Sequence, residues 1–197
     1  MPEVKVSRQE LFPTTLWSFD LSFLQEYFPG WLELIQSWRA AEPTPAGRSN
    51  RQGWNSDARV MQMALFAPLE QAARAAFAHA FEEMKLTAPL RFQLEGWINL
   101  LDQGGYNLAH FHPNRLLSGC FYLQVPQGSA PIGFCDPRPA IMMASMPGTG
   151  ANCGTGVLTT EPFAGQLLVF PYWLEHQVDS HAPAAPRISI GINAIAA

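Results

Sequence analysis

The chain has 197 residues, which predicts one domain over 1–197, and its hydrophobic fraction of 48% is enough for a packed core. Its 12 Lys and Arg against 16 Asp and Glu give a formal charge of -4 without a basic run, which argues against nucleic acid as a partner. Six Trp and thirteen Phe can bury a large apolar area, so intrinsic disorder is excluded.

The cysteines and the distribution of apolar residues indicate the cellular compartment and whether a membrane span is expected. Cys120, Cys135 and Cys153 are odd in number and form no CxxC pair, which predicts reduced thiols and a cytoplasmic protein. The N-terminus lacks the apolar segment of a signal peptide, and no run of about 18 apolar residues occurs anywhere in the chain. We therefore expect no membrane span.

The first part of the chain, 1–88, is expected to be mostly helical and to buttress a sheet. From Pro29 onward, apolar residues recur at the spacing of one helix face, at Trp31, Leu34, Ile35 and Trp38. A loop rich in Pro, Gly, Ser and Asn is expected over 41–56, followed by a second helix within 57–85 that is interrupted at Pro68. Exposed Trp or Phe on these helices would suit a homodimer contact.

The pattern changes at Pro89, and 89–197 is expected to form an all-β core. Short segments rich in β-branched and aromatic residues alternate with Gly and Pro, which favours an antiparallel sandwich or barrel. Between them, the Gly-, Pro-, Ser- and Met-rich stretch 126–165 has the length of a lid or binding loop. The expected strands are 91–100, 107–112, 117–125, 131–135, 166–171 and 187–195.

Three of the five histidines have the spacing of metal ligands. His110 and His112 stand two apart in or at the end of an expected strand, so both rings project to one face while Phe111 enters the other layer. Imidazole is a common ligand of iron, nickel, copper and zinc, and His176 could supply a third ligand from a distant strand. An HxH pair alone is a weak pattern, and on spacing alone ordinary polar roles remain open. We assign such roles to His79 and His181.

The last expected strand alternates strictly between polar and apolar residues. Arg187, Ser189 and Asn193 share the face opposite its isoleucines. A guanidinium on the inner side of a small barrel is unfavourable unless it is paired, so Arg187 and Ser189 would suit a carboxylate ligand. The alternative is a surface arginine that opens an edge strand. Ser118 and Tyr122, on one face of 117–125, could donate hydrogen bonds to the same ligand or be ordinary barrel residues.

Together these motifs resemble a small bacterial and phage family of 2-oxoglutarate- and Fe(II)-dependent oxygenases. The resemblance covers nearly the whole chain and rests on several motifs in the right order. It implies an all-β core with flanking helices, in the form of a double-stranded β-helix (a cupin-like jelly roll) preceded by N-terminal helices. The matching segments are 11–14, 49–50 with 53–54, 97–99, 105–113 continuing to 117–122, 136–138, 165–171 leading to His176, and 187–193.

The resemblance also implies roles for single residues. His110 matches the first iron ligand, His176 matches the distal one, and Arg187-x-Ser189 matches the clamp for 2-oxoglutarate. His112 stands where the wider superfamily has Asp or Glu, so the metal would be held by three imidazoles. In the alternative arrangement His112 lies behind the ligands and a water or a carboxylate such as Asp136 completes the sphere. The expected 2-oxoglutarate-binding residues are Arg187, Ser189, Tyr122, Ser118 and Asn193.

The implied activity is hydroxylation of an unidentified small-molecule or peptide substrate, with conversion of 2-oxoglutarate to succinate and CO₂. Two alternatives keep part of this chemistry. A three-histidine metal hydrolase or hydratase would use the same ligands but has no inherent need for Arg187-x-Ser189. A non-catalytic cupin-like protein that binds a small acid would need no metal.

Overall fold

The computed structural model describes residues 5–87, 90–138, 140 and 156–197. The two α-helices of this part are α1 (Phe28–Ala41) and α2 (Ala67–Glu83). Short 3-10 turns are η1 (Ser22–Tyr27), η2 (Val60–Gln62) and η3 (Ala64–Phe66). The strands are β1 (Trp17–Asp20), β2 (Asn50–Asn55), β3 (Phe92–His110), β4 (Leu117–Gln124), β5 (Ile132–Cys135), β6 (Val157–Thr160), β7 (Gln166–Pro171), β8 (His176–Val178) and β9 (Arg187–Ala196).

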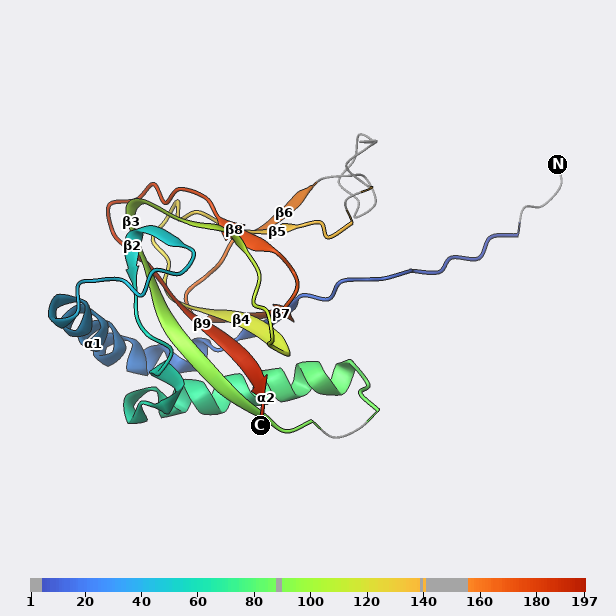
Figure 1. Ribbon diagram of the computed structural model, residues 1–197, viewed down its shortest axis with the longest axis horizontal. Coiled ribbons are helices and arrows are strands. Elements are labelled where there is room, and N and C mark those ends of the chain that lie inside the picture. Colours follow the sequence, from blue (N-terminus) through green and yellow to red (C-terminus); the bar gives the residue numbers. More distant parts are fainter. Residues whose placement is uncertain (1–4, 88–89, 139, 141–155) are drawn as a thin grey trace.

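The strands form one strongly curled antiparallel sheet in the order β1-β7-β4-β9-β3-β8-β5-β6, with β2 also pairing with β3. The long strand β3 holds the two parts of this sheet together. Its first half, Phe92–Leu101, pairs with β9, and its end pairs with β8 at Asn107 and His110. In Figure 1 the helices lie on one side of β3, β9, β4 and β7, and β5, β6 and β8 lie on the other. The inner faces of β3, β9 and β4 therefore lie toward the layer of β5, β6 and β8.

The helices cover the outer face of the larger layer. In α1 the buried residues are Trp31, Ile35 and Trp38, as the helical spacing predicts. Helix α2 begins at Ala67, so Pro68 lies in its first turn and does not interrupt it, since proline there lacks only an N–H that the helix would not use. The expectation of one interrupted helix over 57–85 was wrong for its first ten residues, which form η2 and η3. None of the helices in the described ranges is long and apolar enough to cross a bilayer.

The main core lies between these helices and the sheet. Trp31 is fully buried, stacks on Phe66, and meets Phe121 of β4 edge to face. Its indole N–H donates to the carbonyl of Leu65, so the ring brings no unpaired polar group into the core.

Several strands were not expected from the sequence. The expected loop 41–56 contains β2, whose polar sequence NRQGWN has little strand propensity but pairs with β3. Likewise β3 runs without a break where two strands were expected, because Gly104 adopts a positive φ of 83° and lets the chain turn while pairing continues. Within 126–165, β5 matches the expected strand 131–135, whereas its partner β6 was not expected. Of the expected lid 126–165, residues 139 and 141–155, which include Cys153, lie outside the described residues.

We expect Trp31→Ala to lower the free energy of unfolding by about 3–5 kcal/mol, because it opens a cavity where helix and sheet meet. Denaturant unfolding measures this change. The matched control is Trp173→Ala, which removes a ring that is 42% exposed. A loss from Trp31→Ala no larger than the control would contradict the assigned core.

Candidate metal and carboxylate site

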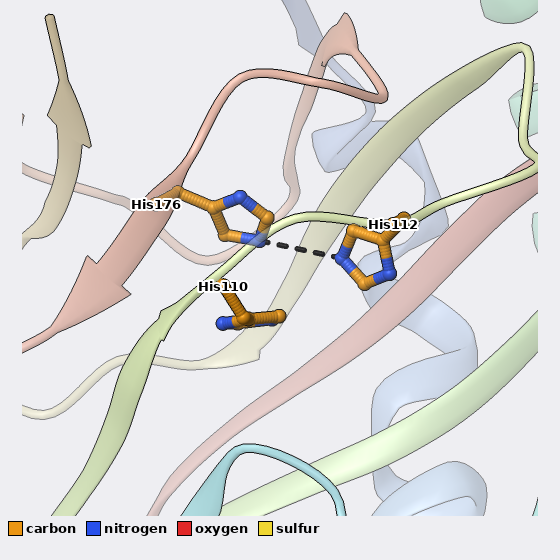
Figure 2. Close-up of side chains that lie close together, drawn as sticks. All are labelled: His110, His112 and His176. Atoms are coloured by element: carbon orange, nitrogen blue, oxygen red, sulfur yellow. Dashed lines mark hydrogen bonds between the residues drawn. The ribbon is translucent and has the colours of Figure 1, made fainter. Parts of the chain in front are cut away.

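The three histidines singled out in the sequence meet at one point. One nitrogen from each of His110, His112 and His176 lies within 4.8 Å of the other two. The ring centroids are 4.3 Å apart for His110–His176, 5.1 Å for His110–His112 and 5.2 Å for His112–His176. Figure 2 shows the rings converging, with the Nε2 atoms of His112 and His176 3.4 Å apart. Two nitrogens bound to one transition-metal ion at about 2.1 Å are separated by about 3.0–3.4 Å, so this pair fits a shared cation.

The backbone orients two of these rings for coordination. His110 ends β3 opposite His176 in β8, and the two are direct partners across the strand pair. The Nδ1 of His110 lies 2.7 Å from the carbonyl oxygen of Leu108, and that of His176 lies 3.0 Å from the carbonyl of Leu174. A carbonyl can only accept, so Nδ1 carries the proton in each ring, which leaves the Nε2 lone pair for a metal. Ser49 Oγ contacts His110 Nε2 at 3.3 Å, a long hydrogen bond that a cation at this lone pair would replace.

Burial keeps the three rings neutral. It lowers the pKa of His176 to about 3, with a further contribution from the neighbouring ring of His110. It lowers the pKa of His112 to about 3 as well, and His176, His110, Arg48 and Arg115 add to this shift. The pKa of His110 is also lowered by burial. Neutral imidazole is the form that binds metals, so near pH 7 no proton has to be displaced.

His112 lies beyond the end of β3, in the loop that follows. Its backbone N–H donates to the carbonyl of Tyr172, which positions it beside the segment that leads to His176. Its ring packs against Trp97, with centroids 5.5 Å apart. The expectation that Phe111 enters the opposite layer was wrong, because the strand has ended and the Phe111 side chain is 53% exposed.

Arg187 lies in the interior, beside the histidines. It opens β9, which lies between β3 and β4, so it is not on an edge strand, and the side chain is 1% exposed. Its Nε and Nη2 have no hydrogen-bond partner among the described residues, and its guanidinium carbon lies 5.1 Å from the centre of the Tyr122 ring. The Tyr122 hydroxyl is likewise buried without a partner, and burial raises the pKa of Tyr122 well above its usual value.

A small cavity connects these two groups of residues. We call it the inner pocket, and it is lined by all three histidines, by Arg187 and Ser189, and by Trp97. Trp97 can lie flat across β9 because the facing residue there is Gly191, where an added Cβ would come 2.6 Å from the indole. Unpaired donors on a buried cation are unfavourable, and an anion in the inner pocket would satisfy them.

The other two expected ligand-binding residues are already paired with protein groups. Ser118 Oγ donates to Asn193 Oδ1 at 2.8 Å, and Asn193 Nδ2 donates to Glu95 Oε1 at 3.0 Å. Arg115 completes this network through its Nε, which donates to the same Glu95 oxygen at 2.6 Å. Ser118 is thereby held away from Arg187, while Asn193 lines a second, outer pocket.

The remaining polar residues considered in the sequence lie elsewhere. Both carboxylate oxygens of Asp136 accept hydrogen bonds from Arg138, and Asp136 is not part of the three-histidine group. His79 is exposed and pairs with Glu83, and His181 Nε2 bonds the carbonyl of Ala185. The ordinary roles expected for both histidines agree with these contacts.

Arg48 was not among the residues predicted from the sequence to form the site. Its guanidinium carbon lies 4.6 Å from the centre of the Trp97 ring, and it lines the outer pocket together with Arg115. No motif pointed to Arg48, because it lies in an expected loop and reaches the histidines only through the pairing of β2 with β3.

Comparison with known proteins agrees with this geometry. Residues 95–193, half of the chain, match the sequence profile of the family described as "Putative 2OG-Fe(II) oxygenase". No curated protein sequence matches the chain closely enough to provide a relative. The fold is similar to those of several solved structures at low sequence identity.

Three of these structures cover most of the chain. A prolyl-4-hydroxylase from Pseudomonas putida is 18% identical, with 92% of each chain covered and a TM-score of 0.61. A prolyl hydroxylase from Trichoplax adhaerens, in complex with a hypoxia inducible factor peptide fragment, is 10% identical over 92% of this chain and 83% of that one (TM-score 0.63). HygX from Streptomyces hygroscopicus, with nickel and 2-oxoglutarate bound, is 13% identical over 93% and 83% (TM-score 0.62). The expected double-stranded β-helix is thereby confirmed.

The metal-free protein should lose stability when it is acidified from pH 7 to pH 5. His112 and His176 titrate near pH 3 when folded and near their ordinary value of 6.5 when unfolded. Between these two pKa values the unfolded chain binds more protons than the folded one. The free energy of unfolding is therefore highest above about pH 6.5, and it decreases as the pH is lowered, by up to about 1.4 kcal/mol per pH unit for each ring. Denaturant unfolding in a chelator at several pH values measures the slope.

The variant His112→Gln should show a shallower slope than the wild type. His79→Gln, which changes an exposed histidine, should keep the wild-type slope. Equal slopes in all three proteins would contradict a buried neutral His112.

Proposed function

The chain belongs to the family of 2OG-Fe(II) oxygenases, and we propose that His110, His112 and His176 hold its Fe(II) while Arg187 and Ser189 hold the far carboxylate of 2-oxoglutarate. Fe(II) and 2-oxoglutarate are the cofactors of this family, and HygX was solved with 2-oxoglutarate and a nickel ion. The enzyme is accordingly an oxidoreductase. Its substrate is unidentified.

The observation that carries the proposal is that Nε and Nη2 of the buried Arg187 have no partner in the part of the chain that the structure describes. Its two free donors lie in the same small pocket as the three histidines, where they match the two oxygens of a carboxylate. The partnerless hydroxyl of Tyr122 could donate to that carboxylate as well. A hydrolytic zinc site would leave these donors without a role, so Arg187 favours the oxygenase over the hydrolase or hydratase.

The three-histidine ligand set gives the proposed metal site an unusual net charge. Three neutral imidazoles replace two imidazoles and a carboxylate, so the bound cation keeps one more unit of positive charge. This favours a dianionic co-substrate, which also has the cation of Arg187 at its other end. When bound, the iron with 2-oxoglutarate supplies the oxidising chemistry of the family.

Neighbouring groups of the protein orient the histidine rings. The carbonyls of Leu108 and Leu174 hold the Nδ1 protons of His110 and His176, which points both Nε2 atoms at the same place. Phe170 packs edge to face on His176 at 4.8 Å and limits the access of water from that side.

We also propose a cytoplasmic enzyme that acts on a small molecule or a peptide. The thiols of Cys120 and Cys135 are free, which supports a reducing compartment. The similar solved structures include one with a peptide and one with hygromycin B bound.

The exposed ring of Phe23 in η1 supports the expected homodimer contact. The formal charge of -4 argues against nucleic acid as a partner.

His176→Ala should abolish the conversion of 2-oxoglutarate to succinate in the presence of Fe(II) and ascorbate, because it removes a buried ligand of the metal. Succinate is measured by mass spectrometry, and His79→Ala serves as the control. Wild-type protein that forms a visible absorption band with anaerobic Fe(II) and 2-oxoglutarate would support the co-substrate assignment. The absence of both the band and the succinate would refute it.

Arg187→Lys should raise the KM for 2-oxoglutarate at least about tenfold, since lysine keeps the charge but loses the fork that pairs with a carboxylate. The affinity for Fe(II) should change little, because Arg187 does not touch the metal. An unchanged KM would show that the carboxylate lies elsewhere.

His112→Ala should weaken Fe(II) or Co(II) binding by at least about a hundredfold, measured by anaerobic titration calorimetry. His79→Ala should leave metal affinity unchanged. If His112→Ala also keeps its affinity, two histidines and another group hold the metal.

A further inference from the structure

The histidine cluster has a second open side, formed by the outer pocket. This cavity of about 260 Å³ shares His110, His112 and Trp97 with the inner pocket. Its remaining lining residues do not line the inner pocket, and they are Arg48, Ser49, Phe111, Pro113, Arg115 and Asn193. Arg187 and Ser189 line only the inner pocket, so the two cavities approach the metal ligands with different cations.

The two arginines of the outer pocket differ in what they can still bind. Arg115 is paired with Glu95 at 2.6 Å, and the same carboxylate also accepts from Asn193. This network neutralises Arg115 and fixes its position. Arg48 has no acidic partner among the described residues, and its charged group lies over the face of Trp97.

The guanidinium of Arg48 lies over the face of Trp97, and a guanidinium packed on an aromatic face keeps N–H donors available for an anion. The ring that carries Arg48 also contacts His112. An anion on Arg48 would therefore be held one indole ring away from the metal ligands.

The charge of the outer pocket is positive. Neither Asp nor Glu belongs to its lining, and Glu95 behind it is matched by Arg115. The cation of Arg48 is left uncompensated next to a metal site that itself lacks a carboxylate ligand. Trp97, Phe111 and Pro113 supply apolar walls.

We propose that the outer pocket binds the primary substrate, a small molecule with a carboxylate that pairs with Arg48 and an apolar body that packs on Trp97 and Phe111. This inference rests on the proposed function, which assigns 2-oxoglutarate to the inner pocket. One free guanidinium matches the two oxygens of a carboxylate, whereas a phosphate dianion would call for a second cation, and Arg115 is already taken. The volume suits a compact molecule.

The test uses phenylacetate as the carboxylate probe and phenylacetamide as its neutral counterpart of the same shape. Both are titrated by ligand-observed NMR into wild-type protein loaded with Zn(II) and saturated with 2-oxoglutarate. Phenylacetate should bind at least about fivefold more tightly than phenylacetamide, and Arg48→Gln should remove that preference. Arg48 is exposed on the surface, and thermal unfolding of the variant checks that it folds.

Arg59→Gln is the matched control, because Arg59 is also exposed and stacks on a tryptophan, Trp38, at 4.7 Å, but lines neither pocket. It should keep the wild-type preference for phenylacetate. Loss of the preference in Arg59→Gln, or its retention in Arg48→Gln, would overturn the proposal.

The same titrations distinguish a substrate carboxylate in the outer pocket from the carboxylate of 2-oxoglutarate in the inner pocket. Phenylacetate binding that depends on Arg48 should persist when 2-oxoglutarate is added, whereas binding that Arg48→Gln leaves intact and 2-oxoglutarate displaces belongs to the inner pocket. Displacement of the Arg48-dependent binding by 2-oxoglutarate would show that the outer pocket takes the co-substrate, which overturns this inference. If the protein fails to bind 2-oxoglutarate at all but holds phenylacetate through Arg48, the proposed function fails and the assignment of a carboxylate to Arg48 stands.

Discussion

The central constraint in this protein is a buried arginine whose charge the fold leaves only partly satisfied. Arg187 is carried into the interior by β9, between β3 and β4, and two of its nitrogens meet no acceptor among the described residues. Removing a guanidinium from water without full compensation is strongly unfavourable. The surrounding sheet and the helical layer must be stable enough to maintain it, and an anion in the inner pocket would remove the imbalance.

The packing shows how that stability is obtained at a distance from the site. Apolar burial is concentrated on the outer face of the sheet, around Trp31 and the helices, while the inner face carries the polar and charged residues. The second, smaller apolar cluster includes Phe134 from β5 and Phe170 from β7, and both rings contact His176. One face of each central strand thus supports the fold and the other carries the chemistry, a separation that the two-residue periodicity of a strand makes available.

The two pockets place separate arginines beside the three histidines. Arg187 lies deep and is 1% exposed, whereas Arg48 lies at the surface. Trp97 separates the two, and it can do so because Gly191 leaves room for its ring across β9. A single residue without a side chain therefore determines the wall shared by both cavities.

The segments with a strong residue pattern could be predicted, in their order, from the sequence alone. The spacing of Trp31, Ile35 and Trp38 predicted α1, the alternation in 187–195 placed Arg187 and Ser189 on one face, and the motifs from 97 to 193 identified the oxygenase family and its fold. These features depend on neighbours within one element or on a pattern of residue types. Elements such as β2 and β8 are short or polar and are stabilised by partners far away in the chain, so their own residues carried little signal.

By itself, the sequence determined which side chains are available for the chemistry: three imidazoles, an inward arginine and the apolar faces that bury it. Only the tertiary structure decided which of the other polar groups remain free. Ser118 and Asn193 bind each other, Asp136 pairs with Arg138, and Arg48 is brought to Trp97 by a strand pairing across the fold. The physical reason is that hydrogen bonding between distant segments is a property of the folded packing, and local spacing along the chain does not encode it.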